Sequence, residues 1–408
     1  MRLSTAFQAL AIPNFRLLWI CSIVSVMGVW LHRVAESWLT LEMTGSPFYV
    51  GLVGFLSFAP TLVLSPLGGV LGDRYPKRTV IFITQAIMTV TAGILAILAF
   101  ADMLQYWHLA VMATIHGFVM SVDMPVRQAF MVEVVGKERI HSAVGMNSLA
   151  FNLARAIGPA LGGALLAGFS PGYCFAYNAV SYGAVLFALV SMSGIVPIRY
   201  DSAQKPGAFK DGLRYLIKQK SVIGLLALLT IVSILIYPYI NQLPVFAKSI
   251  LKTGPEGFGW LMSFVGIGAI MGAIFAAMLT QVNTRARFIR YMPFLYIPAL
   301  LLFSQSTSFT LSAVSLVLCS FGTTATLSMI NASIQVLVVD EMRGRVMGTY
   351  SSALNGLYPI GVLVAGFFVD NFGAPETFTG YVFIAAVMLT ALFAFYRPQW
   401  REMLNSDK

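Results

Sequence analysis

Long apolar stretches separated by short polar segments dominate this sequence and limit what it can fold into. Hydrophobic residues make up 58% of the 408 residues and charged residues only 10%, against about 25% charged residues in soluble domains. A helix needs about 20 apolar residues to cross ~30 Å of hydrocarbon with its backbone polar groups satisfied. The sequence therefore predicts an all-α integral membrane protein and excludes an ordinary soluble enzyme.

Turn and polar residues divide the chain into twelve predicted transmembrane helices in two pseudo-symmetric halves. Residues 1–196 form an N-terminal six-helix bundle and residues 221–408 a C-terminal one. Residues 197–220 are a cytoplasmic linker, in which apolar residues at helical spacing predict an amphipathic helix. The expected spans are 15–41, 47–71, 79–101, 106–132, 141–168, 172–196, 221–247, 257–281, 288–306, 309–338, 343–369 and 377–396.

The distribution of Lys and Arg predicts the orientation. If the N-terminus is cytoplasmic, 21 of the 26 Lys and Arg residues fall in cytoplasmic segments, and only Lys248 and Lys252 fall outside. Positive residues concentrate on the cytoplasmic side of membrane proteins. We therefore expect a multi-pass protein of a bacterial-type cytoplasmic (inner) membrane with both termini in the cytoplasm. The net charge of +10 reflects this topology, and no nucleic-acid partner is expected.

An internal repeat relates the two halves. A shift of 203 residues aligns Gly163 with Gly366, and a shift of 209 aligns Gly45 with Gly254. The first shift equates the fifth span with the eleventh. Parallel repeats of this kind place two bundles around a pseudo-two-fold axis along the membrane normal.

The segment between the second and third spans carries a resemblance to a known family. Its residues follow the pattern G-x-x-x-D-R/K-x-x-R/K-R/K, with Gly69, Asp73, Arg74, Lys77 and Arg78 in register. This resembles the signature of the major facilitator superfamily, which implies two six-helix halves and transport by alternating access. It also implies that Asp73 approaches the start of the eleventh span and acts as an access-gating latch. A charged loop that only fixes the topology is the alternative.

Apart from Arg16, Arg290, Arg343 and Arg345 at the cytoplasmic ends of their spans, the charged residues within the predicted spans all belong to the first half. Such groups cost several kcal/mol in hydrocarbon unless they are paired or hydrated, so each is a candidate for proton or charge coupling. The five are Arg33, Glu36, Asp123, Arg127 and Arg155.

Two pairs among these charges leave alternatives open. Asp123 and Arg127 are four residues apart and can pair on one helix face, either as a structural ion pair or as part of a conformational or proton-linked switch. Glu36 can bind and release a proton as its surroundings alternate between wet and buried. Equally, Arg33 can simply neutralise Glu36.

The fifth span carries small residues and a proline, namely Gly145, Gly158, Pro159, Gly162 and Gly163. Their spacing is similar to the antiporter motif of proton-driven drug exporters, except that Ala154 replaces the second glycine. Generic close packing of helices explains the same glycines. The stretches 14–19 and 147–155 resemble the enterobactin-exporter and multidrug-efflux branch of the superfamily.

The resemblance implies that spans 1, 4, 7 and 10 line the transport path. Aromatic, methionine and amide side chains there suit an amphipathic ligand, although the same residue types often pack between helices or face lipid. The candidates for the substrate cavity are Trp30, His116, Met120, Tyr237, Asn241 and Asn331. Pro238 and Pro244 predict that the seventh span is broken.

The expected function is secondary active export of an amphipathic small molecule, drug-like or siderophore-like, by alternating access and proton antiport. The alternatives are an importer or facilitator of a solute or lysolipid, and a non-transporting membrane receptor. The expected partners are the substrate, protons and membrane lipid, and the protein is expected to work as a monomer. No cofactor, metal site or enzymatic activity is expected: no phosphate-binding loop occurs, and the proton gradient supplies the energy.

Overall fold

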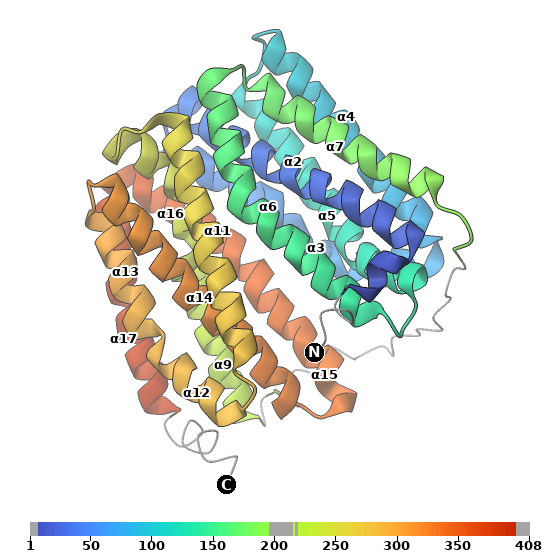
Figure 1. Cartoon of the computed structure of the whole chain (residues 1–408). Coiled ribbons are helices and arrows are strands. Elements are labelled where there is room, and N and C mark those ends of the chain that lie inside the picture. Colours follow the sequence, from blue (N-terminus) through green and yellow to red (C-terminus); the bar gives the residue numbers. More distant parts are fainter. Residues whose placement is uncertain (1–6, 196–214, 217–218, 397–408) are drawn as a thin grey trace. The chain divides into compact units, whose positions relative to one another are not determined.

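The computed structural model describes residues 7–195, 215–216 and 219–396, without the side chains of residues 62–63, 65–73 and 340–341. The described residues form helices and connecting turns and no strand (Figure 1). The helices of the first half are η1 (Gln8–Ala11), α2 (Pro13–Thr44), α3 (Pro47–Arg74), α4 (Lys77–Phe100), α5 (Tyr106–Val135), α6 (Ile140–Gly168) and α7 (Gly172–Ser191). Those of the second half are α9 (Lys220–Ile231), η2 (Val232–Ile236), η3 (Tyr237–Gln242), α10 (Leu243–Val245), η4 (Phe246–Ile250), α11 (Gly254–Met278), α12 (Val282–Tyr291), α13 (Pro293–Gln305), α14 (Phe309–Leu337), α15 (Asp340–Ser351), η5 (Ser352–Gly356), α16 (Leu357–Phe372) and α17 (Ala374–Phe395).

These helices have the length and composition of membrane spans. Within the described residues, 11 helical segments are long and apolar enough to cross a membrane, and α3 adds a shorter apolar part at Pro47–Thr61. Each such segment forms its backbone hydrogen bonds internally, as hydrocarbon requires. The predicted all-α membrane fold is confirmed.

The chain divides into two compact units, each dominated by one half of the sequence. Unit 1 comprises residues 1–45, 56–202 and 253–263, and unit 2 comprises residues 46–55, 203–252 and 264–408. Residues 46–55, which include the start of α3, thus belong to unit 2. Residues 253–263, which include the start of α11, belong to unit 1. The predicted bundle boundaries at 196 and 221 stay a prediction.

Unit 1 is built around α2, which packs along both α6 and α7. α4 packs against α7 and α5 on the neighbouring side, and Figure 1 shows α4 and α7 side by side. A core of buried apolar residues joins these helices, including Leu31, Leu95, Leu109 and Phe175. The side of α2 that carries Leu31 is therefore buried against the neighbouring helices of unit 1.

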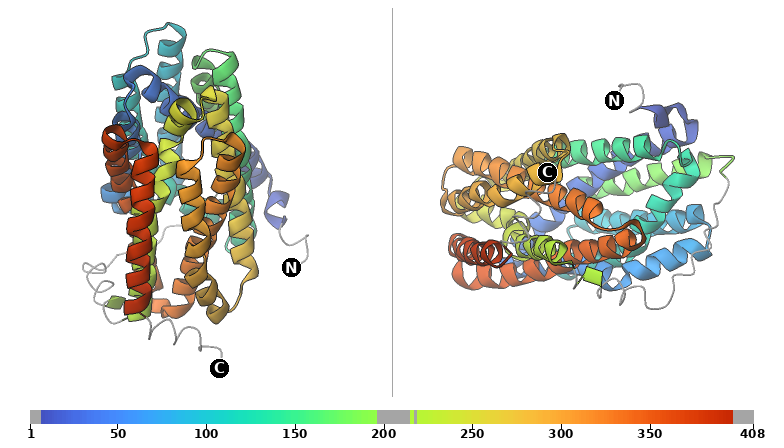
Figure 2. Two further views of the ribbon diagram at one scale, coloured as in Figure 1. Left: turned by 90° about the vertical axis from the view of Figure 1, so that its left-hand side faces the viewer. Right: turned by 90° about the horizontal axis from the view of Figure 1, so that it is seen from below.

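In unit 2, α14 packs against α13, α12 and α9. α13 packs against α14 and α17, while α17 also lies along α9 (Figure 2). The rings of Phe246, Phe303 and Phe378 meet in its core, with centroids of Phe246 and Phe303 4.4 Å apart. These rings are fully buried.

The predicted break in the seventh span is present. The span runs from α9 through a π-helical turn (η2), a 3-10 segment (η3), one turn of α10 and a second π-helical turn (η4). Pro238 and Pro244 each lack a backbone N–H and so cannot continue the regular ladder. The break places Asn241 and Gln242 between the two prolines.

Two glycines that the repeat aligns share a backbone geometry. Gly45 follows α2 and Gly254 begins α11, and both have φ of +67°. A left-handed φ strains residues that carry a Cβ, so glycine suits these positions. Positions related by the shift of 209 residues thus make the same turn.

Two expected segments differ from the structure or lie outside it. The ninth span was expected to begin at residue 288, but helix α12 already begins at Val282. Helix α12 is amphipathic: its apolar face buries Ala286 and Ile289. The three arginines of α12 therefore do not prevent the helix from forming. The predicted amphipathic helix in the linker lies almost entirely outside the described residues.

Candidate functional site

One side of α2 brings ionisable side chains together inside unit 1. His32 Nε2 lies 4.0 Å from Glu36 Oε1 one turn along the helix, and Glu36 is 8% exposed. His116 on α5 lies within electrostatic range of His32 and Arg33. The first and fourth spans therefore share a cluster of His32, Arg33, Glu36 and His116, which we call the α2 cluster.

Aromatic rings surround the α2 cluster. The Arg33 guanidinium carbon lies 5.4 Å from the ring centroid of Trp30 and 5.2 Å from that of Phe58 on α3. The ring of Phe175 on α7 meets His32 edge-on with centroids 4.9 Å apart. Ring faces stabilise a desolvated guanidinium by about 2 kcal/mol, so Arg33 can keep its charge within the span.

Asp123 on α5 is held in a network of a different kind. Its carboxylate accepts hydrogen bonds from Thr84 Oγ1, from Gln85 Nε2 at 3.2 Å and from Arg127 Nε at 2.9 Å. Asp123 is only 2% exposed. The predicted pairing of Asp123 with Arg127 is confirmed, and the network ties α5 to α4.

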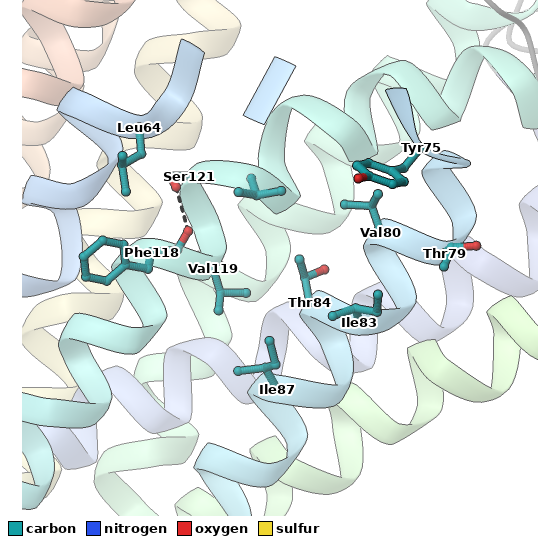
Figure 3. Close-up of a pocket in the computed structure, with 11 residues that line it drawn as sticks. Leu64, Tyr75, Thr79, Val80, Ile83, Thr84, Ile87, Phe118, Val119 and Ser121 are labelled. Atoms are coloured by element: carbon teal, nitrogen blue, oxygen red, sulfur yellow. Dashed lines mark hydrogen bonds between the residues drawn. The ribbon is translucent and has the colours of Figure 1, made fainter. Parts of the chain in front are cut away.

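A cavity of about 560 Å³ opens beside this network, between α4, α5 and α3 (Figure 3). Its walls are almost entirely apolar, and Thr84 is the side chain that links it to Asp123. Figure 3 shows Ile83 and Ile87 on one wall and Phe118 on the other. None of the six predicted substrate-cavity residues lines it.

The charged segment between α3 and α4 is shorter than the predicted loop. α4 already begins at Lys77, whose side chain is 6% exposed and donates to Glu133 Oε1 on α5 at 2.8 Å. Arg78 donates to the backbone oxygen of Val190 at 3.2 Å. Arg74 ends α3 and is exposed. Gly69 and the side chain of Asp73 lie in the part of α3 whose side chains are not described, so the latch stays a prediction.

Three glycines of α6 stand at close helix contacts. A methyl group at Gly158 would lie 2.7 Å from Cβ of Trp30, and one at Gly162 would lie 3.1 Å from Cα of Leu31. At both contacts α6 packs closely against α2. Pro159 lies inside α6, next to Gly158. At Gly145 a methyl group would meet no described atom within 4 Å.

Gly163 contacts another helix. A methyl group there would lie 2.9 Å from Cα of Gly259 on α11. The repeat-related Gly366 on α16 stands in the same way against Gly51 on α3, at 3.1 Å. We call these contacts the α6/α11 crossing and the α3/α16 crossing. Each joins helices from the two halves of the sequence within one unit.

The predicted substrate-cavity residues fall into two groups. Unit 1 contains Trp30, His116 and Met120, of which Trp30 is buried against Gly158 and Phe151. Met120 packs beside the apolar cluster of Met88 and Val119.

Unit 2 contains the other three residues, Tyr237, Asn241 and Asn331. The rings of Tyr237 and Tyr358 meet edge-on at 6.4 Å. Asn331 Oδ1 accepts a hydrogen bond from Gln335 Nε2. Their roles in binding substrate stay predictions.

Reasoning from the sequence missed the partners that hold the buried charges. Thr84 and Gln85 were not singled out because polar uncharged residues are common in spans. Glu133 was missed because it lies near the end of a predicted span, where a solvated charge is ordinary. A signal was available: Lys77 and Glu133 begin and end consecutive antiparallel spans, which places them at the same membrane depth.

Comparisons with known proteins agree with this architecture. A family model described as transmembrane secretion effector matches residues 4–408. The Staphyloferrin A transporter of Staphylococcus aureus (strain NCTC 8325 / PS 47) is 26% identical over 400 residues, covering 95% of this chain and 97% of that protein. The multidrug efflux pump Tap of Mycolicibacterium fortuitum is 24% identical over 393 residues, covering 92% of this chain and 93% of that protein.

Among solved structures, the nucleoside transporter NupG matches with a TM-score of 0.72 at 14% identity, covering 94% of this chain and 99% of that chain. This likeness shows the fold. The predicted resemblance to the enterobactin-exporter and multidrug-efflux branch is confirmed by the curated relatives. The chain is therefore a multi-pass membrane transporter of the major facilitator superfamily, and it belongs to the transmembrane secretion effector (MFS_3) family.

Proposed function

We propose that the chain is a secondary active exporter that carries an amphipathic small molecule, drug-like or siderophore-like, out of the cytoplasm by proton antiport. The name of one relative, the Staphyloferrin A transporter, supports a siderophore-like substrate. The name of another, the multidrug efflux pump Tap, supports drug-like substrates and export. In this proposal the bundles 1–196 and 221–408 move against each other, and Asp73 acts as the access latch.

The difference between two buried carboxyl groups of unit 1 carries the proposal. Asp123 accepts hydrogen bonds from three side chains, which fix the position of its carboxylate. Within the described residues, Glu36 has one ion-pair contact, to His32 at 4.0 Å. A carboxyl group held this loosely gains and loses a proton when its surroundings alternate between water and a buried state. Glu36 is therefore the proposed proton site.

Competition at Glu36 would couple the two transported species. A hydroxyl or ammonium group of the substrate that binds the Glu36 carboxylate displaces its proton, so the site holds one or the other. Arg33 lies one turn before Glu36 and is positioned by Trp30 and Phe58. The positive charge of Arg33 offsets the negative charge of ionised Glu36. It thereby lowers the free-energy cost of keeping this carboxylate in the membrane when neither a proton nor substrate is bound to it.

The proposed setting is a bacterial inner membrane, with both termini and the turn between α3 and α4 on the cytoplasmic side. The Lys and Arg distribution supports this orientation. Both sequence halves needed for a transport path belong to one chain, which supports a monomer working in lipid. The proton gradient is the proposed energy source.

Flux across a defined membrane tests the proposal. The full-length protein is reconstituted in proteoliposomes with an imposed pH gradient, and flux is followed for a fluorescent amphipathic cation and for a catecholate siderophore. We expect gradient-driven flux of at least one probe. Glu36→Gln should abolish the dependence on the gradient and retain exchange, because the substituted amide cannot titrate. Asp123→Asn should retain the dependence in the protein that folds.

Gradient-independent flux in the unaltered protein would refute antiport and favour a facilitator. Flux that depends on the gradient but is lost only in Asp123→Asn would move the proton site away from Glu36. If a probe moved in the same direction as protons, the protein would be a symporter, and proton antiport would be refuted.

A further inference from the structure

Two buried amide groups stand at the α3/α16 crossing. Gln242 on η3 is 0% exposed, and its Nε2 donates to the backbone oxygen of Pro47 on α3 at a long distance of 3.4 Å. A methyl group at Gly366 on α16 would lie 3.3 Å from the same Nε2. The Gln242 amide thus lies between the two helices that cross.

Both amides have an atom left without a hydrogen-bond partner. Gln242 Oε1 and Asn241 Nδ2 are buried, and neither has a partner among the described residues. Asn241 Nδ2 lies against the backbone of Gly54 on α3. A buried donor or acceptor that loses water and gains no partner disfavours the packed state that buries it.

The repeat-related α6/α11 crossing has a hydrogen bond between its two helices, although Thr253 Oγ1 just before α11 is also buried without a partner among the described residues. Ser263 Oγ on α11 accepts the backbone N–H of Ala160 on α6 at 3.0 Å. The rings of Trp38 and Phe258 stack beside it with centroids 6.2 Å apart. Two crossings with the same glycine-to-glycine geometry therefore differ in their polar contacts.

The local backbone allows the amides at the α3/α16 crossing to be released. Asn241 and Gln242 lie in the 3-10 segment η3, between Pro238 of the same segment and Pro244 of α10. The π-helical turns η2 and η4 lie on either side. Irregular turns of this kind mark hinges in helices. Separation of α3 from α16 would expose both amides to water and supply their missing partners.

We propose that Asn241 and Gln242 make the α3/α16 crossing the weaker of the two, so that it separates first when the transporter changes access. The unpaired amide atoms destabilise the closed crossing, and hydration stabilises the open one. The α6/α11 crossing, with Ser263 satisfied, stays closed longer. This inference rests on the alternating access of the proposed function, and it concerns which contact opens and not what is carried.

Spin labels at the crossing measure its state directly. Tyr49→Cys on α3 and Asn371→Cys on α16 place labels at two exposed positions of unit 2, while the native cysteines are buried. Distance distributions are recorded by pulsed electron spin resonance on the full-length protein in lipid nanodiscs. Two populations are expected, one with the crossing closed and one with it open.

Removing a polar side chain should have opposite effects at the two crossings, because the polar atom is unpaired at one and hydrogen-bonded at the other. Gln242→Met keeps the volume and removes both the unpaired oxygen and the long, weak bond to Pro47, so the closed population should rise roughly ten-fold relative to the open one. Asn241→Leu should act in the same direction. A second label pair across the α6/α11 crossing, at Leu161→Cys and Trp260→Cys, should show that Ser263→Ala raises the open population there, because it removes the hydrogen bond from the N–H of Ala160 across the crossing. Gln305→Met, which alters an exposed amide, serves as the control and should change neither distribution.

The outcomes separate this inference from the proposed function. A single population at both crossings, whatever the substrate or pH, would refute alternating access. Two populations that Gln242→Met and Asn241→Leu leave unchanged, or shift toward the open state, would overturn the inference and leave the transporter proposal standing. A ten-fold shift toward closure, with slower transport of any carried probe, would support it.

Discussion

Arg127 Nε lies 2.9 Å from Asp123 Oδ2 across one turn of α5, and the carboxylate at this contact is almost fully buried. Removing one member of a buried ion pair leaves an uncompensated charge, which costs about 3–5 kcal/mol. Because Arg127 keeps partial exposure, we expect Arg127→Ala to destabilise the protein by about 3 kcal/mol. Thermal unfolding of the detergent-solubilised protein measures this loss.

Thr84→Val serves as the comparison for Arg127→Ala, because it removes a neutral donor to the same carboxylate. We expect a smaller loss, of about 1–2 kcal/mol. If Arg127→Ala proved as stable as the unaltered protein but changed the dependence of transport on pH, the pair would be a switch and not a structural contact.

Lys77 and Glu133 form the second buried pair, with 6% and 3% of their side chains exposed and 2.8 Å between Nζ and Oε1. We expect Lys77→Ala to cost about 3–5 kcal/mol, since it leaves Glu133 charged and buried. The exposed Arg74 offers a matched control, and Arg74→Ala should leave the melting temperature unchanged. Equal melting temperatures for the two variants would contradict a structural role for Lys77.

Arg33 and Phe58 give a prediction that tests the aromatic surroundings of the α2 cluster. Their separation of 5.2 Å in a partly buried setting corresponds to a coupling of about 1–2 kcal/mol. A double-mutant cycle with Arg33→Met and Phe58→Leu, followed by thermal unfolding, measures that coupling. Additive losses from the two substitutions would show that the ring does not stabilise the guanidinium.

Apolar length and the spacing of glycines were enough to predict the fold. Spans must close their own hydrogen bonds in hydrocarbon, so each long apolar run had one available structure. Pro238 and Pro244 likewise predicted the broken seventh span, because each removes a backbone donor. The repeat aligned Gly45 with Gly254, and both have a φ of +67°.

The partners within the candidate site could not be predicted in the same way. The i, i+4 spacing of Asp123 and Arg127 fixes their distance along one helix, so their pairing was predictable. Contacts between helices depend on the rotation and depth of each helix, which apolar composition on every side leaves open. Thr84 was therefore invisible as a partner of Asp123, and Lys77 was interpreted as a loop charge although it is buried against Glu133.

Gly163 and Gly145 on α6 share a residue type but stand in different surroundings, and this difference gives the last prediction. A methyl group at Gly163 would lie 2.6 Å from the backbone oxygen of Pro255, which has no flexible side chain to yield, whereas one at Gly145 meets nothing within 4 Å. We expect Gly163→Ala to force α6 and α11 apart and to raise the accessibility of a cysteine placed at Trp260. Gly145→Ala should stabilise the helix by up to about 1 kcal/mol through its better helix propensity. Maleimide labelling and thermal unfolding distinguish the two variants. The contrary outcome is that Gly145→Ala impairs transport as strongly as Gly163→Ala while both proteins stay folded. Close helix packing in this structure would then not explain why these glycines are needed.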